Sequence, residues 1–208
     1  MPKLAQYKEC TGCMACVDSC SHNALQATLN EEGHIVPLMD ESKCVNCKLC
    51  ERACPVVGKL PYSQSPVASS FAGWAKDKVV RKKSATAGAF SALAQYVFSK
   101  GGVVCGASNV DGVQVKHICI GKVDELNKLQ GSKYTQSNAE GIYKTVYGKL
   151  KQGKLVLFSG TGCQVAGLYG YLGKRTYSGR LITVDLICGG VPSKFLINKF
   201  IECEPYQV

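Results

Sequence analysis

Two copies of one cysteine pattern stand at the start of this 208-residue chain. The first copy comprises Cys10, Cys13, Cys16 and Cys20, and the second comprises Cys44, Cys47, Cys50 and Cys54. Both follow the spacing C-x2-C-x2-C-x3-C, and the offset between equivalent cysteines is constant from the first member of each copy to the last. Gaps this short wrap the chain tightly around a bound group, so three sulfur atoms of each copy can reach the same group.

The spacing is that of the run that holds a [4Fe-4S] cluster in bacterial two-cluster ferredoxins, where the fourth cysteine of each run ligates the other cluster. A turn of helix carries this fourth cysteine past its own run and towards the neighbouring cluster. We therefore assign cluster one to Cys10, Cys13, Cys16 and Cys54, and cluster two to Cys44, Cys47, Cys50 and Cys20. The sequence thus predicts a protein that transfers electrons.

Zinc and disulfides are the alternatives for eight such cysteines. Structural zinc sites usually pair a C-x2-4-C knuckle with a distant second half. Disulfides need an oxidising compartment, and residues 1–6 do not resemble a secretion signal. No apolar run approaches the length that a membrane span requires. We therefore expect a protein of the reducing cytoplasm.

The first cysteine run departs from the usual pattern only at Ser21, where such runs commonly have a proline. That proline ligates nothing.

Five further cysteines are scattered along the chain, and we expect most of them to be small buried apolar residues. They are Cys105, Cys119, Cys163, Cys188 and Cys203.

The formal net charge of +10 is unevenly distributed. Residues 1–60 carry six basic and seven acidic side chains, and each cluster held by four thiolates adds further negative charge. Residues 61–208 carry nineteen basic and eight acidic side chains. No aromatic stripe alternates with the basic residues and no nucleic-acid motif is present, so we expect no nucleic-acid partner. Attraction of a phosphate-bearing cofactor or an acidic substrate explains the excess, as do solvated helix faces.

The chain divides into two domains. Residues 24–40 predict a hairpin with a turn at Glu32 and Gly33, and His34 is expected on its surface. Residues 61–70 are rich in proline and serine and have the composition of a linker. We predict an α+β protein: a ferredoxin-like domain over residues 1–60, the linker over 61–70, and an α/β domain over 71–208.

The second domain alternates strands and helices, which favours a sheet packed on both faces. Strands are expected at residues 67–75, 103–108, 113–120, 155–158 and 181–187, and helices at 87–100, 139–151 and 193–202. Asp111 and Gly112 form a turn signal between two of these strands. The chain ends soon after the last helix, and we expect it to be part of a longer protein.

A glycine-rich turn at residues 158–164 joins an apolar strand to a helix. Thr161 and Gln164 have the spacing of a capping box. Gly160 and Gly162 let backbone approach a ligand, and a helix N-terminus attracts phosphate. Val165 occupies the third glycine position of the dinucleotide fingerprint, so that motif is absent. Phosphate or flavin contact and an ordinary tight turn both remain open.

Two more polar loops lie beside helices, at residues 82–88 and 131–137. Serine and threonine before a helix are usually caps, but three such loops in one domain joined to a ferredoxin indicate a bound cofactor.

At these loops the chain resembles the coenzyme F-420 hydrogenase/dehydrogenase beta-subunit family. The resemblance is carried by R-x-x-S-x-x-x-G at residues 81–88, G-S-K-Y at 131–134, G-T-x-C-Q-x-A-G-L at 160–168 and C-x-G-V-P-S at 188–193. It implies an iron–sulfur flavoprotein in which residues 71–208 form an α/β flavin-binding domain and hold FAD in these loops beside the clusters. The implied FAD contacts are Ser84, Thr86, Gly88, Gly131, Ser132, Lys133, Tyr134, Gly160, Thr161, Gly162, Cys163 and Gln164.

Within this set, Lys133 is expected to face a phosphate, and Cys163 is either a buried structural thiol or a neighbour of the flavin ring. The sequence departs from the family pattern at residues 84–88, at Gly162 and at Gly189, where the family commonly has S-S-S-G-G, proline and histidine. The first change removes hydroxyl and glycine contacts near the expected flavin. Gly189 removes an imidazole, so we carry over no acid–base role at that position. We assign no catalytic residue.

The resulting hypothesis is a flavin-dependent oxidoreductase that couples two-electron hydride transfer at FAD to one-electron transfer through two [4Fe-4S] clusters. Its expected partners are ferredoxin or another redox protein and a small-molecule substrate, with a deazaflavin as one candidate. The alternative is a non-enzymatic, ferredoxin-type electron-transfer subunit that docks to a partner enzyme.

Overall fold

The computed structural model describes residues 1–58, 69–112, 114–175 and 177–203. Its N-terminal part contains α1 (Ala15–Ser19), β1 (Leu25–Leu29), β2 (Ile35–Met39), η1 (Glu41–Lys43) and α2 (Leu49–Ala53). The strands β1 and β2 pair in antiparallel fashion, which confirms the predicted hairpin. The Asn30 side chain closes its turn by accepting hydrogen bonds from the backbone N–H groups of Glu32 (3.1 Å) and His34 (2.8 Å). The helices α1 and α2 occupy equivalent positions in the two cysteine runs.

The second part is built around one mixed sheet. Its first half contains α3 (Lys78–Lys82), η2 (Thr86–Gly88), α4 (Ala89–Ser99), β3 (Val103–Asp111), β4 (Gln114–Ile120) and η3 (Val123–Lys128). Its second half contains β5 (Ser137–Asn138), α5 (Ile142–Lys151), β6 (Val156–Thr161), α6 (Gly162–Leu172), β7 (Leu181–Leu186) and α7 (Lys194–Cys203). The strand order is β5-β4-β3-β6-β7, with β3 and β4 antiparallel and the other neighbouring pairs parallel.

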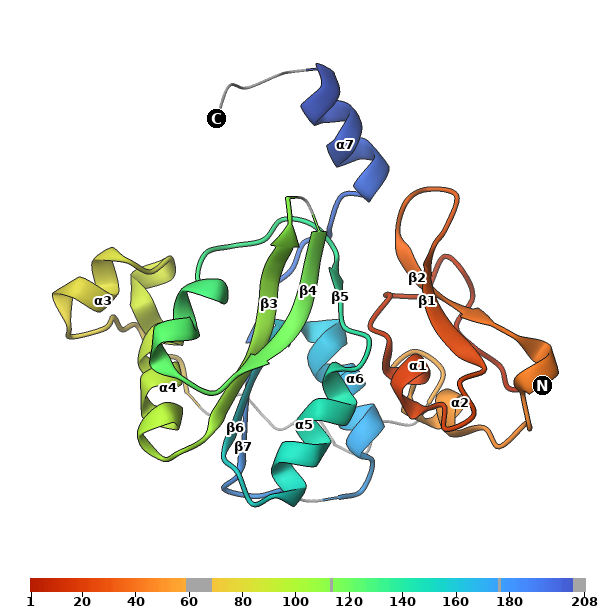
Figure 1. The fold of residues 1–208 in the computed structure, drawn as a ribbon, viewed down its shortest axis with the longest axis horizontal. Helices are drawn as coiled ribbons and strands as arrows, with labels where there is room; N and C mark the ends of the chain where they lie inside the picture. The colour runs from red at the N-terminus through yellow and green to blue at the C-terminus, as the bar shows by residue number, and fades with distance from the viewer. Residues whose placement is uncertain (59–68, 113, 176, 204–208) are drawn as a thin grey trace.

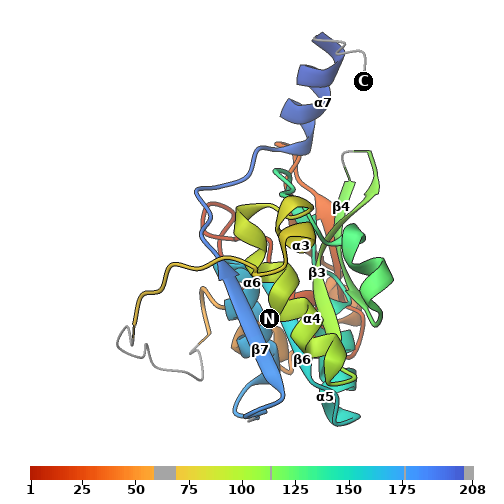
Figure 2. The ribbon, with the colours of Figure 1, turned by 90° about the vertical axis from the view of Figure 1, so that its left-hand side faces the viewer.

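Helices cover both faces of this sheet, as the strand–helix alternation predicts (Figures 1 and 2). On one face α4 and η3 pack through Ala94, Val97 and Leu126. On the other face α5 and α6 lie between the sheet and the N-terminal module. That second core is continuous across the two modules, because Val17 and Ile35 belong to the same buried cluster as Tyr143 and Leu168.

The prediction of a strand at residues 67–75 is wrong for residues 69–75, which are the ones that the structure describes. Residues 67 and 68, like most of the predicted linker at 61–70, lie outside the described residues, and 69–75 form no strand. Phe71 is 92% exposed and Trp74 is also exposed, so the apolar pattern there does not mark a buried face. The short α3 was not predicted. The other predicted strands and helices of the second domain are confirmed to within a few residues at their ends.

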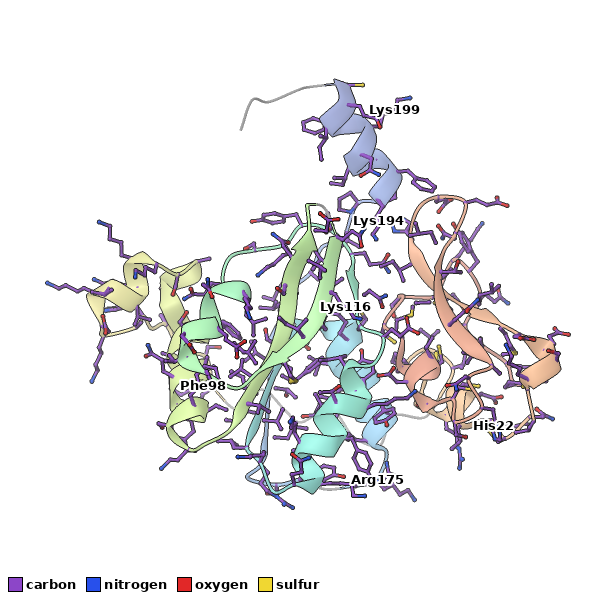
Figure 3. All side chains as sticks on the ribbon, in the orientation of Figure 1. His22, Phe98, Lys116, Arg175, Lys194 and Lys199 are labelled. Atoms are coloured by element: carbon purple, nitrogen blue, oxygen red, sulfur yellow. A yellow bond between two sulfur atoms is a disulfide. The ribbon has the colours of Figure 1, made fainter. Side chains whose placement is uncertain are left out.

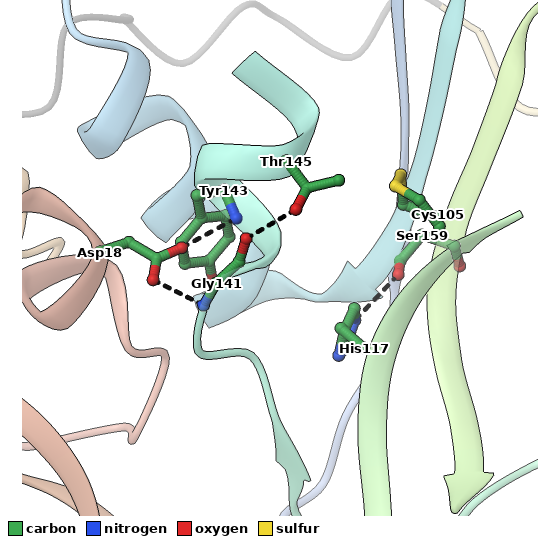
Figure 4. Close-up of a disulfide and its surroundings, with 8 residues drawn as sticks. Asp18, Cys105, His117, Gly141, Tyr143, Thr145 and Ser159 are labelled. Carbon is green, nitrogen blue, oxygen red and sulfur yellow. Dashed lines mark hydrogen bonds between the residues drawn. A yellow bond between two sulfur atoms is a disulfide. The ribbon is translucent and has the colours of Figure 1, made fainter. Parts of the chain in front are cut away.

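The five scattered cysteines are not mostly buried apolar residues, and that prediction is wrong. The β3–β4 register places Cys105 directly opposite Cys119, and the two form a disulfide (Figure 4). Cys188 and Cys203 are exposed, and Cys163 is half-buried. Sequence spacing alone did not show that a turn at Asp111 and Gly112 would bring two cysteines face to face.

Helix α7, the last element that the structure describes, extends beyond the sheet (Figure 1). Its first residue is held to the β1–β2 turn, because the Lys194 backbone N–H donates to the Gly33 carbonyl (3.0 Å). None of the described helices is long and apolar enough to span a membrane.

Candidate iron–sulfur and cofactor site

Two hollows in the N-terminal module are lined by cysteines. The cluster-one hollow is lined by Cys10, Cys13, Cys16 and Cys54, and the cluster-two hollow by Cys20, Cys44, Cys47 and Cys50. Each encloses about 330 Å³ of space that is partly open to solvent. Each hollow therefore takes three cysteines from one run and the last cysteine of the other, the same sets that the spacing predicts.

The backbone of the two runs repeats along with the cysteines. Residues with left-handed backbone stand at Gly12 (φ 64°) and Met14 (φ 62°), and again at the equivalent positions of the second run, Asn46 (φ 56°) and Lys48 (φ 60°). Turns of this kind direct backbone N–H groups into a concavity that binds anions, including iron–sulfur clusters. Left-handed backbone costs a residue with a β-carbon roughly 1–2 kcal/mol. Its recurrence at equivalent positions shows that the loops fit an anionic group held by thiolates.

Burial controls the protonation of these thiols. It raises the pKa of Cys13 to about 12, and it also raises the pKa of Cys10, Cys16 and Cys50. Iron binds the thiolate, so cluster assembly in these hollows must release protons.

Helix α6 brings the second domain against the cluster-one loop. A β-carbon at Gly170 would overlap the carbonyl oxygen of Ala53, and one at Gly167 would lie 3.2 Å from the Cys13 sulfur. Glycine at these two positions therefore allows the α6 backbone to approach the ligand loops closely.

A buried carboxylate joins the same two modules. Asp18, in the first cysteine run, accepts hydrogen bonds from the backbone N–H groups of Gly141 (2.6 Å) and Tyr143 (2.9 Å), as Figure 4 shows. It thereby caps the N-terminus of α5, which has no cap from its own chain segment. The Tyr143 hydroxyl lies 2.7 Å from the Cys13 carbonyl and 3.2 Å from that of Gln164, and it donates to these acceptors. The sequence did not point to Asp18 or Tyr143, because nothing local marks a cap that comes from another domain.

A third contact between the modules is made by an amide side chain. The Gln136 side chain accepts from the Ile35 backbone N–H (2.6 Å) and donates to the Ile35 carbonyl (2.9 Å). The segment that follows residues 131–134 is therefore fixed against the edge of β2.

The structure brings the loops at residues 84–88 and 131–134 together. The Ser84 hydroxyl donates to the Val80 carbonyl (2.7 Å) and lies 2.7 Å from the Ser91 hydroxyl. The Gln130 side chain donates to Ser91 (3.0 Å) and joins the two loops. Gly88 has left-handed backbone (φ 80°) at the start of α4. Thr86 stands in η2, and its side chain lies outside what the structure describes.

The loop at 131–134 contains a half-buried cation. Lys133 Nζ donates to the Gln130 carbonyl (2.8 Å), and burial lowers the pKa of this ammonium group. Gly131 has left-handed backbone (φ 79°), Ser132 is exposed, and Tyr134 is 78% exposed. Among the described polar side chains of these two loops, those of Ser84 and Lys133 are at least partly buried. Both have hydrogen-bond partners within the protein.

The turn at residues 160–164 forms the predicted capping box, with Thr161 and Gln164 bonded reciprocally at the start of α6. The Cys163 sulfur lies 3.2 Å from the Thr161 hydroxyl. Cys163 packs against the buried core that also contains Cys13 and Cys16. A β-carbon at Gly162 would lie 3.3 Å from an Asp185 carboxylate oxygen. This carboxylate opposes phosphate at the α6 N-terminus and favours a ligand group that donates hydrogen bonds.

A buried histidine ties the ends of two strands to this turn. His117 lies 2.8 Å from the Ser137 hydroxyl and 3.2 Å from the Ser159 carbonyl, and its ring stacks on Phe158. Burial lowers the pKa of His117 to about 4, so the ring is neutral and donates one N–H to the carbonyl. The signal in the sequence was a histidine on the same face of β4 as Val115, which is buried.

Comparison with known proteins agrees with this geometry. Residues 9–57 match the family of 4Fe-4S dicluster domains, and residues 70–143 match the N-terminal domain family of coenzyme F420 hydrogenase/dehydrogenase beta subunits. No curated protein matches the chain. A chain in a structure of the F420-reducing [NiFe] hydrogenase complex from Methanosarcina barkeri is similar in fold, with a TM-score of 0.50 and 24% sequence identity. The similarity covers 62% of the present chain and 47% of the hydrogenase chain, so it spans about half of the length of that relative.

The dicluster match supports two [4Fe-4S] clusters in the N-terminal module, where the two hollows and their repeated loops fit them. The continuous core and the glycine contacts of α6 join this module to the second domain. Residues 9–57 of the chain thus resemble a 4Fe-4S dicluster domain, and residues 70–143 resemble the N-terminal domain of coenzyme F420 hydrogenase/dehydrogenase beta subunits.

Proposed function

We propose that this chain is an iron–sulfur flavoprotein oxidoreductase that couples hydride transfer at FAD to one-electron transfer through two [4Fe-4S] clusters. In this proposal cluster one is held by Cys10, Cys13, Cys16 and Cys54, and cluster two by Cys20, Cys44, Cys47 and Cys50. When bound, a flavin exchanges electron pairs with a hydride donor or acceptor and single electrons with iron–sulfur clusters. The setting proposed is the cytoplasm, the electron partner is a redox protein, and a deazaflavin is the candidate substrate.

The observation that carries the proposal is the double role of α6. The helix begins at the turn of residues 160–164, and one turn later it packs on the cluster-one loop through Gly167. A redox cofactor at the turn would therefore lie at one end of the helix that contacts a cluster ligand. The Tyr143 hydroxyl, placed between the Cys13 and Gln164 carbonyls, holds the loop and the helix at a fixed separation.

The residues of the second domain would bind FAD in different ways. The Asp185 carboxylate suits a hydrogen-bond donor of the cofactor, while Lys133 supplies the positive charge that a phosphate requires. Lys133 would have to exchange its contact with the Gln130 carbonyl for one with the phosphate. The half-buried Cys163 thiol lies in the first turn of α6 and packs against the core that contains Cys13 and Cys16.

A specific observation favours the second candidate function, an electron-transfer subunit without a flavin. Ser84, Lys133 and Gln164 all make hydrogen bonds within the protein, so the three loops are satisfied without a ligand. In that case the second domain would serve to dock the dicluster module to a partner enzyme.

Anaerobic purification followed by iron, sulfide and flavin assays separates the two functions. The proposal predicts about eight irons and one FAD per chain. Lys133→Gln should weaken FAD binding about tenfold, as expected for the loss of a charge-assisted hydrogen bond. The matched control Lys128→Gln, whose ammonium pairs with Glu125 (2.8 Å), should leave FAD binding unchanged. Eight irons without flavin would instead support the electron-transfer subunit.

A further inference from the structure

We propose that the cluster-two hollow is the surface at which electrons are exchanged with an acidic iron–sulfur carrier protein, and that the cluster-one hollow is the internal relay to the second domain. The proposal rests on the proposed electron-transfer function, and it adds the order of the two sites and the location and chemistry of the partner.

The two hollows differ in the exposure of their cysteines. Around the cluster-one hollow, Cys13, Cys16 and Cys54 are buried. Around the cluster-two hollow only Cys50 is buried, and Cys47 is exposed. Transfer between proteins requires a close approach of the two redox centres, so the hollow with the exposed ligand is the one that a partner can reach.

The second domain packs against Cys13, one of the cysteines that line the other hollow. Gly167 of α6 stands against the Cys13 sulfur, and the Tyr143 hydroxyl of α5 bonds to the Cys13 carbonyl. In Figure 1 the N-terminal module lies beside α5 and α6 with its helices α1 and α2 towards them. A partner protein therefore meets the cluster-two side first.

The rim of the cluster-two hollow is apolar with a small excess of positive charge. Val45 (58% exposed) and Leu49 (37% exposed) line the hollow beside Lys48 and His22. His22 lies at the outer side of the module, away from the sheet (Figure 3). Near the hollow, Lys43 forms an ion pair with Asp40 (2.7 Å). The Glu51 carboxylate accepts a hydrogen bond from the Lys3 backbone N–H (3.0 Å) and does not line the hollow. Among the described residues that line this hollow, Lys48 supplies the positive charge of the rim.

These features fit a partner that is itself an iron–sulfur protein. Four thiolates around a cluster leave an excess of negative charge, so two such proteins repel each other when their clusters approach. Lys48 stands where it would lie between the two negative groups and reduce that repulsion. An apolar rim of two side chains suits the small, short-lived interfaces of electron-transfer complexes.

The test is stopped-flow reduction of the intact, cluster-loaded protein by a reduced acidic plant-type [2Fe-2S] ferredoxin. We expect Lys48→Glu to lower the second-order rate constant about tenfold at low salt, and high salt to abolish most of the difference. The control Lys122→Glu changes an exposed lysine that precedes η3, and it should alter the rate less than twofold. Val45→Asp is a second variant of the rim, and it should slow the reaction in the same way.

Dithionite is the reference reductant because it needs no docking surface. Reduction by dithionite at the wild-type rate in all variants, together with slow reduction of Lys48→Glu and Val45→Asp by ferredoxin, would support the proposal. Wild-type rates with ferredoxin in both rim variants, or an equal loss in Lys122→Glu, would overturn it. Wild-type protein that accepts electrons from neither reductant would instead refute the electron-transfer function itself.

Discussion

Two glycine-to-alanine substitutions in neighbouring helices should have opposite effects on stability. Gly148 in α5 has no atom within 4 Å of the position that a β-carbon would occupy, whereas a β-carbon at Gly170 in α6 would overlap the Ala53 carbonyl oxygen. Alanine in a helix interior is favoured over glycine by about 0.8–1 kcal/mol. Gly148→Ala should therefore stabilise the protein by about that amount.

Gly170→Ala should gain the same stability from helix propensity but lose more stability through overlap with the Ala53 carbonyl oxygen. Both atoms at the contact belong to, or are fixed directly to, the backbone, so relief requires α6 to move away from α2. Forced repacking of this kind costs typically about 1–3 kcal/mol. Because the β-carbon would overlap a backbone atom, we take the upper part of that range, about 2–3 kcal/mol, and the helix-propensity gain of about 1 kcal/mol leaves a net loss of about 1–2 kcal/mol. For a protein of this size a change of about 1 kcal/mol shifts the unfolding temperature by about 2–4 °C.

Anaerobic thermal unfolding, followed by circular dichroism and by cluster absorbance, measures both variants. Gly148→Ala should unfold a few degrees above the wild type, and Gly170→Ala a few degrees below it with earlier loss of the cluster signal. If Gly170→Ala is as stable as Gly148→Ala, α6 is not in contact with the dicluster module and the proposed relay through this helix is refuted.

Three further predictions concern buried polar groups and the cross-strand cysteines. Asp18→Ala should lower the free energy of unfolding, measured in urea, by about 2–4 kcal/mol, because it leaves buried N–H groups unpaired. The control Asp40→Ala removes an exposed cap and should cost about 1 kcal/mol. Equal losses in the two variants would contradict the interdomain cap. Burial lowers the pKa of His117 to about 4 from an unfolded value near 6.5, so the unfolded state binds the extra proton as the pH falls through this range. Wild-type stability should therefore fall by about 2 kcal/mol between about pH 7.5 and 5 relative to His117→Asn, and parallel profiles would disprove this. Alkylation of the unfolded protein without reductant, followed by mass spectrometry, should leave Cys105 and Cys119 unmodified, and labelling of both would show that the pair is reduced.

The cysteine sets could be predicted from sequence because the runs are short and repeated. The constant offset between the runs fixes two equivalent loops, and local backbone then determines which sulfur atoms face each hollow. The capping box at Thr161 was predictable for the same reason, since its partner Gln164 lies within the same helical turn.

Contacts between distant segments could not be predicted in this way. The residues around Asp18 do not distinguish it from an ordinary acidic residue in a short helix. Its role as a cap depends on α5, which lies in the other domain. The opposition of Cys105 and Cys119 depends on strand register, and a shift of one residue would place the two cysteines on different faces. The strand prediction around Trp74 was wrong because apolar residues can also lie exposed on an irregular segment.

An anaerobic reductive titration tests the central claim most directly, because it counts the electrons that one chain accepts. Two [4Fe-4S] clusters take about one electron each and a flavin takes about two. The proposed coupling of FAD to both clusters predicts about four electrons per chain, with bleaching of both flavin and cluster absorbance. A total of two electrons, with cluster bleaching alone, would contradict the flavoprotein function and leave a dicluster electron carrier.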